Sequence, residues 1–133
     1  MTMKIVLDSH AVLAYINDEP AAEKVQEYLD LGREEKAKLY MNVVNLGEVY
    51  YVLSRRKGVD VANIAMALLK KKPITFIIAD ERLALMAGRI KAFHKLSYAD
   101  AFAAATAIDL DAVLLTGDDE FRSVEDKVKI EWL

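Results

Sequence analysis

Short apolar runs alternate along the chain with segments whose apolar residues recur at helical spacing. Residues 4–7 form a β-branched run that ends at Asp8, and helically spaced apolar residues follow at once. The same alternation continues to the last apolar run. The pattern predicts five strands, at residues 4–7, 39–41, 74–78, 112–115 and 128–132.

Helices are expected between these strands, and several of their ends carry recognisable signals. Pro20, beside two acidic residues, is expected to start the second helix, and Gly32 to stop it. Asn42 or Asn45 can cap the third helix. Ser97 is expected to cap the last long helix, which is rich in alanine.

This alternation predicts an α/β fold. Helices that connect parallel strands cover both faces of a sheet, so we expect a three-layer α/β/α sandwich around a mostly parallel five-stranded sheet. The chain has 133 residues and shows no repeat, linker or break in composition. A single domain over residues 1–133 is therefore expected.

Composition narrows the class of protein. An apolar content of 54% excludes a disordered chain, and no apolar run reaches the length of about twenty residues that a membrane span needs. The absence of cysteine excludes a disulfide scaffold and a thiolate metal site, and fits a cytoplasmic location. The formal net charge of -3, taken alone, disfavours a nucleic-acid partner.

Four acidic residues fall where α/β sheets place ligands. Asp8 follows the first strand and Asp118 lies just beyond the fourth. If these strands are neighbours where the strand order reverses, both carboxylates face one crevice. Asp100 lies in the first turn of the helix before the fourth strand, and Glu48 in the first turns of the helix after the second.

Carboxylates in one crevice repel each other unless a cation neutralises them. Oxygen donors without cysteine or paired histidines select Mg²⁺ or Mn²⁺, which can promote hydrolysis of a phosphodiester. Structural explanations stay open for three of the acids: Asp8 as a helix cap, Asp100 as the capping-box partner of Ser97, and Asp118 as a turn residue. Glu48, among apolar neighbours, is the most informative.

Other residues that could carry chemistry favour supporting roles. His10 and His94 have no second histidine or cysteine at ligand spacing, which favours surface or supporting positions. The basic clusters at residues 55–57 and 70–72 lie at helix C-termini. There, solvated helix ends and RNA contacts explain them equally well.

Four stretches match the motifs of one known family, in the family's order: IVLDS at 5–9, NLGEV at 45–49, LSYADAFAAATA at 96–107 and LLTGDDEF at 114–121. On these stretches the chain resembles the PIN-domain nucleases, in particular the small toxins of the VapC type, over essentially its whole length. The resemblance implies the sheet order 3-2-1-4-5. It also implies an acidic quartet that binds Mg²⁺ or Mn²⁺ and cleaves RNA, formed by Asp8, Glu48, Asp100 and Asp118.

The resemblance implies supporting residues and partners as well. Ser9 and Thr116 match positions where the family often has a hydroxyl beside the metal site, and Asp119 matches a position that varies. Members of the family form homodimers, and an antitoxin protein inhibits the toxins by laying its C-terminal segment across the active-site groove.

Other acid-bearing α/β folds fit less well. Haloacid-dehalogenase-type phosphatases need a second aspartate two residues after the first, where this chain has His10. Response-regulator receivers need an acidic pair near the first strand and a lysine after the last, and neither is in place. A PIN nuclease that processes RNA without an antitoxin, and a catalytically inactive PIN scaffold, remain alternatives.

The charge argument changes once the acids are located. Four of the 21 acidic residues belong to the expected metal site, where a bound cation would cancel much of their charge. The other 17 nearly balance the 18 lysines and arginines. Net charge therefore does not exclude an RNA substrate.

Overall fold

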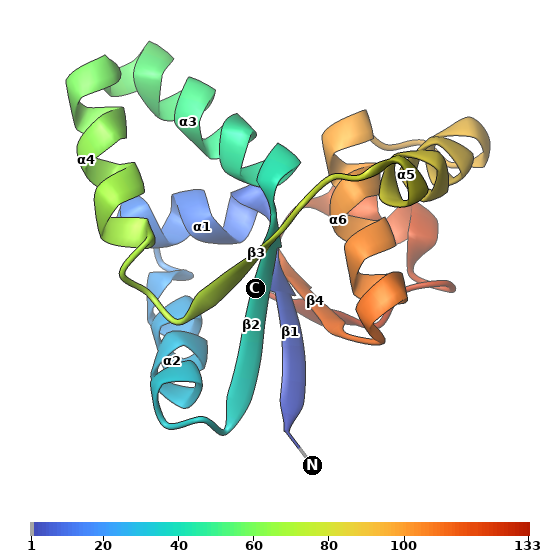
Figure 1. Ribbon diagram of the computed structural model, residues 1–133, viewed down its shortest axis with the longest axis horizontal. Coiled ribbons are helices and arrows are strands. Elements are labelled where there is room, and N and C mark those ends of the chain that lie inside the picture. Colours follow the sequence, from blue (N-terminus) through green and yellow to red (C-terminus); the bar gives the residue numbers. More distant parts are fainter. Residues whose placement is uncertain (1) are drawn as a thin grey trace.

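The computed structural model describes residues 2–133, whose five strands form one parallel sheet (Figure 1). The strands are β1 (Met3–Leu7), β2 (Ala37–Asn42), β3 (Ile74–Ile77), β4 (Val113–Thr116) and β5 (Ile130–Trp132). Their order is β3-β2-β1-β4-β5, and every neighbouring pair is parallel. The expected order is confirmed, and it reverses between β1 and β4.

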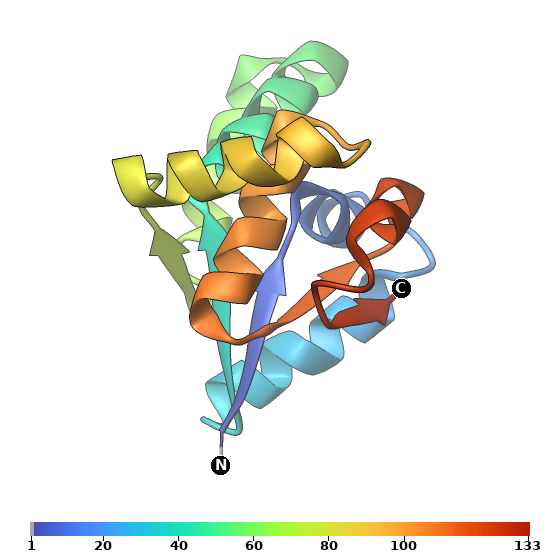
Figure 2. The same ribbon diagram turned by 90° about the vertical axis from the view of Figure 1, so that its right-hand side faces the viewer.

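Helices cover both faces of the sheet, which confirms the expected three layers (Figures 1 and 2). One face carries α1 (Ser9–Ile16), α2 (Ala22–Arg33), α3 (Val43–Lys57) and α4 (Val59–Leu69). The other carries α5 (Glu81–Phe93), α6 (Tyr98–Leu110) and the 3₁₀ helix η1 (Asp119–Val124). Within residues 2–133, none of these helices is both long enough and apolar enough to span a membrane.

The sheet separates two apolar cores. Side chains alternate along a strand, so Ile5 and Leu7 face the helices α1 to α4, whereas Val6 faces α5 and α6. In α6, five alanines are fully or almost fully buried. Their small side chains let α6 lie close to the sheet, so the first turn of α6 is carried to the carboxyl ends of the strands.

Helix α2 begins later than predicted, because the preceding residues close α1. Asp18 has a left-handed backbone conformation with φ 52°. Its amide, and that of Glu19, donate to carbonyls in the last turn of α1, which is the hydrogen-bonding pattern of a helix end. Pro20 therefore precedes α2, which starts at Ala22.

Gly32 lies inside α2 rather than at its end. A Cβ at this position would lie 3.0 Å from Cγ of Pro73 and 3.1 Å from Cδ1 of Leu39. The glycine thus permits the close approach of α2 to the sheet. The left-handed residue that closes α2 is Glu35, with φ 59°.

The structure shows which of the predicted residues cap α3 and α6. Asn42 caps α3 by accepting from the amide of Val44, whereas Asn45 is buried inside the helix. Ser97 caps α6 as expected, by accepting from the amide of Asp100. These caps fix the starts of the two helices that carry Glu48 and Asp100.

Candidate active site

Three fully buried polar residues lie level with one another at the carboxyl ends of β1, β2 and β4. Leu7 pairs with Leu115, so the next residues, Asp8 and Thr116, come side by side. Asn42, the last residue of β2, lies level with Asp8 on the opposite side. Asp8, Thr116 and Asn42 each have an exposed fraction of 0%. The strand register therefore determines the floor of the site.

Both carboxylate oxygens of Asp8 are engaged. Oδ1 accepts from the amide of Ala11 at 2.8 Å and caps α1, while Oδ2 accepts from the hydroxyl of Thr116. The cap proposed as a structural explanation for Asp8 thus exists alongside its position in the site. The two hydrogen bonds hold the carboxylate rigidly at the edge of the sheet.

Thr116 links Asp8 to the turn that carries Asp118. Its hydroxyl donates to Asp8 and accepts from the amide of Asp118 at 3.0 Å. One oxygen of Asp118 accepts from the amide of Glu120 at 2.9 Å and caps η1. The turn after β4 is therefore stabilised by Thr116 and by the Asp118 carboxylate that it brings to the site.

Asp100, Asp118 and Glu120 form the centre of the site. One carboxylate oxygen from each lies within 4.8 Å of those of the other two, a spacing at which they could hold a metal ion. Asp100 is buried, Asp118 is half-buried and Glu120 is exposed. The group therefore opens from the interior toward solvent.

Glu120 was not identified from the sequence, which pointed instead to its neighbour Asp119. The 3₁₀ helix is anchored by Phe121, which is fully buried, and Asp119 lies on its outer face with an ion pair of 3.5 Å to Arg122. Glu120 lies on the side that faces Asp100. The position of Glu120 directly before an aromatic residue, at the end of a run of three acids, was the available signal.

Glu48 lies at the side of the site. It is half-buried on α3, and one of its oxygens accepts from the hydroxyl of Ser9 at the start of α1. Its charge is felt at Asp100, where it contributes to the raised pKa. The chain therefore brings Asp8, Glu48, Asp100 and Asp118 to one edge of the sheet, with Ser9 and Thr116 bonded to two of them.

The electrostatics of the site favour a cation. Burial raises the pKa of Asp8 to about 6, against the hydrogen bonds from Thr116 and Ala11 that lower it. Burial, followed by the charges of Asp118 and Asp8, raises the pKa of Asp100 to about 8. Without a counter-charge these carboxylates take up protons, and a divalent cation would replace them.

The donor set fits a hard divalent cation. The ligands on offer are carboxylate oxygens, which suit Mg²⁺ or Mn²⁺ and do not suit soft metals. The buried Asp8 and Asp100 would be the fixed ligands, and Asp118 and Glu120 would complete the group from the turn after β4. Such an arrangement is chemically suited to hydrolysis of a phosphate ester.

His10 lies at the rim, against the turn that carries Asp118. A Cβ at Gly117 would lie 2.7 Å from Cε1 of His10, so the imidazole packs closely on the backbone of this turn and would have to move if residue 117 carried a side chain. The positive charge that His10 can carry lowers the pKa of Asp8. His10 thus has a supporting position near the carboxylates.

Comparison with known proteins agrees with this arrangement. The sequence model of a family described as the PIN domain matches residues 5–127. No curated protein sequence matches the chain at a significant level.

Solved structures with the same fold include several bacterial proteins. A VapBC2 structure from Rickettsia felis, bound to a DNA fragment from the promoter, aligns with a TM-score of 0.78 at 17% identity, over 97% of this chain and 98% of that one. VapC20 of Mycobacterium tuberculosis gives 0.72 at 17% identity, over 90% and 94%. VapBC-1 of nontypeable Haemophilus influenzae gives 0.72 at 21% identity, over 98% of both chains.

Stability of the metal-free protein should fall as the pH rises from about 5 to about 8. The folded pKa values of Asp8 and Asp100 lie above 3.8, so the folded state binds more protons than the unfolded state between these limits, and deprotonation disfavours folding. Thermal unfolding in EDTA, followed by circular dichroism, measures the effect. Asp100→Asn should flatten the pH dependence, and an equal midpoint at both pH values in the unmodified protein would contradict the interpretation.

The carboxylate group predicts that Glu120, and not Asp119, contributes to cation binding. Glu120→Gln should weaken Mn²⁺ binding about tenfold or more, because it removes a charged oxygen ligand. Asp119→Asn makes the same chemical change one residue earlier and should leave the affinity unchanged. Isothermal titration with Mn²⁺ measures both, and the reverse ranking would show that η1 is oriented differently.

Proposed function

The chain belongs to the PIN-domain family, and on that premise we propose that it is a Mg²⁺- or Mn²⁺-dependent endoribonuclease that hydrolyses RNA phosphodiester bonds. The observation that carries the proposal is the convergence of buried Asp8 and Asp100 with Asp118 and Glu120 at the reversal point of the sheet. Gathering these charges destabilises the fold unless a cation binds them. In a catalytically inactive scaffold, the same cluster of carboxylates would cost folding free energy without contributing to a reaction.

Each acidic residue has a role in the proposed reaction. Asp8, Asp100 and Asp118, together with Glu120, would hold the cation. Glu48, which accepts from the Ser9 hydroxyl, would complete the site and help to orient the attacking water. A bound divalent cation supplies a water of lowered pKa and stabilises negative charge on the phosphate. Glu120 is the exposed member of the carboxylate group and lies on its solvent side, from which substrate and water would approach.

RNA is the proposed substrate class. The carboxylate group opens to solvent at the sheet edge, so a phosphodiester in an unstacked strand could reach it. Among the proteins that share the fold, VapC20 is a sarcin-ricin loop cleaving toxin. The near balance of charge outside the site is compatible with a polyanionic substrate.

Asp8→Asn is expected to reduce RNA cleavage at least about 100-fold while the chain stays folded, because a cation ligand is lost and its contribution is worth several kcal/mol. Cleavage of transfer and ribosomal RNA in the presence of Mn²⁺ measures the activity. Asp126→Asn, the same change at an exposed loop residue, is the control and should cleave normally. Equal activity of Asp8→Asn, or undiminished cleavage in excess EDTA, would exclude this mechanism.

The proposed protein partner is an antitoxin, which would make the chain the toxin of a VapBC-type pair. Several proteins with the same fold were solved as toxin–antitoxin complexes, including one from Klebsiella pneumoniae. On α4, the apolar side chains of Val61, Ile64 and Leu68 are exposed along one helix face. With residues of α1 and α2 they line a groove of about 700 Å³. A groove of this kind suits the apolar face of a partner helix.

We expect Ile64→Glu combined with Leu68→Glu to abolish inhibition of this chain by its proposed antitoxin. Burial of each side chain on binding is worth about 1.5–3 kcal/mol, so losing both weakens binding at least about 100-fold. Growth rescue on co-expression, together with RNA cleavage by the purified variant, separates binding from activity. Ile108→Glu, on the opposite face of the sheet, is the control. Full rescue of the double variant would place the antitoxin elsewhere.

A homodimer is the proposed assembly. Leu85 and Phe93 on α5 are 69% and 79% exposed, and both are large apolar side chains. Large apolar side chains so exposed on one helix are candidates for a contact surface. They lie across the sheet from the groove beside α4, so a second copy and an antitoxin could bind together.

A further inference from the structure

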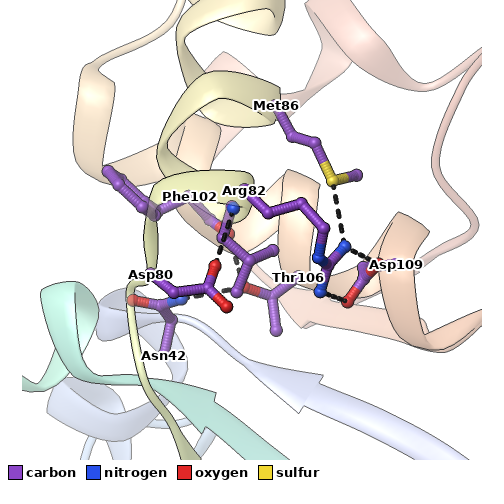
Figure 3. A network of polar contacts seen from close by, with 8 residues as sticks. Asn42, Asp80, Arg82, Met86, Phe102, Thr106 and Asp109 are labelled. Carbon is purple, nitrogen blue, oxygen red and sulfur yellow. Dashed lines mark hydrogen bonds and ion pairs between the residues drawn. The ribbon is translucent and has the colours of Figure 1, made fainter.

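Two fully buried asparagines tie the first turn of α3 to α6. Nδ2 of Asn42 donates to Oγ1 of Thr106 at 3.1 Å, a contact that Figure 3 shows, and Nδ2 of Asn45 donates to the carbonyl of Ala99 at 3.0 Å. The two attachment points lie about two helical turns apart on α6. Only the second lies next to a carboxylate of the site.

The peptide group between Ala99 and Asp100 is held at both of its polar atoms. Its carbonyl accepts from Asn45, and its amide donates to Oγ of Ser97 at 3.1 Å. Because the peptide group is planar, these two bonds fix its orientation. Asn45 and Ser97 together therefore set the position of the Asp100 Cα, from which the buried carboxylate extends.

Asn45 also lies on the same face of α3 as Glu48. Residues three apart in a helix lie on one face, so Asn45, which bonds to α6, and Glu48, whose charge acts on Asp100 of α6, project from the same side of α3. The carboxylate of Glu48 is held from the other side by Ser9. A shift of the first turn of α3 along α6 would therefore change the separation of Glu48 from Asp100.

Asn45 makes this attachment at a disadvantage. Its Oδ1 is buried and has no hydrogen-bond partner within residues 2–133. An unsatisfied buried acceptor disfavours folding, and an apolar residue could fill the same space without one. What an apolar residue could not provide is the hydrogen bond to the carbonyl of Ala99.

We propose that Asn45 is a positioning residue, which sets Asp100 and Glu48 at the separation that the divalent cation requires. The inference rests on the metal-dependent function proposed above. Asn45 itself touches neither cation nor substrate, and acts through the Ala99 carbonyl and through its place on α3. Asn42, at the end of β2, bonds to α6 at Thr106, about two turns beyond Asp100, so its bond does not hold the Ala99–Asp100 peptide group and it has no such role.

The test is Mn²⁺ binding by the full chain, measured by isothermal titration at fixed pH. Asn45→Ala should bind Mn²⁺ about tenfold more weakly or worse, the usual loss when a group that orients a metal ligand is removed. Thr106→Val removes the acceptor of Asn42 and is the matched control. It should lower thermal stability while leaving Mn²⁺ affinity unchanged.

Ser97→Gly is an independent second variant, because glycine preserves most of a helix cap but removes the hydroxyl that holds the Asp100 amide. It should also weaken Mn²⁺ binding, even if Asn45→Ala fails to fold. Unchanged affinity in either folded variant would overturn the proposal, as would an equal loss in Thr106→Val. If the unmodified chain does not bind Mn²⁺, the proposed function fails as well, which is a distinct result.

Discussion

Electrostatic repulsion among carboxylates at one edge of the sheet is the constraint on which the rest of the molecule depends. Burial and neighbouring negative charge raise the pKa of Asp100 to about 8, and burial raises that of Asp8 to about 6. For each of these two carboxylates, the ionised form is less stable here than in water. The apolar cores on the two faces of the sheet supply the free energy that keeps them there. The metal-free site is thus a point of stored electrostatic free energy, which a divalent cation would release.

Hydrogen bonds at this edge contribute direction more than stability. A typical bond adds about 1 kcal/mol net, which is small beside the cost of burying a charged group. Yet the Thr116 hydroxyl bridges Asp8 and the turn after β4, and the Ser9 hydroxyl holds Glu48. Because the Thr116–Asp8 and Ser9–Glu48 bonds join segments far apart in the chain, they fix the carboxylates relative to one another. Rigid placement matters here, since Mg²⁺ tolerates little deviation from octahedral geometry.

The strands and the positions of the four acids could be predicted because they follow from local patterns: apolar runs that end in a carboxylate, and helix caps. The sheet order required the family resemblance. The ends of α2 could not be predicted, because Asp18 and Glu35 adopt left-handed conformations that sequence rules assign to glycine. Glu120 was missed since the choice between it and Asp119 depends on how η1 turns around Phe121. The attachment of Asn45 to Ala99 joins distant segments, and no local pattern reveals it.

Location, rather than net charge, decides what an acidic chain can bind. Several basic side chains lie over aromatic rings: Arg55 is 5.4 Å from the ring centroid of Tyr51, and Lys70 is 4.0 Å from that of Phe76. Contacts of this kind hold a cation against the protein surface and reduce its reach toward a phosphate. With charge nearly balanced outside the site, long-range attraction of a polyanion is weak. An RNA substrate would therefore be held mainly by short-range contacts around the cation, so substrate selection would depend on the shape of the surface around the carboxylates more than on the overall charge of the chain.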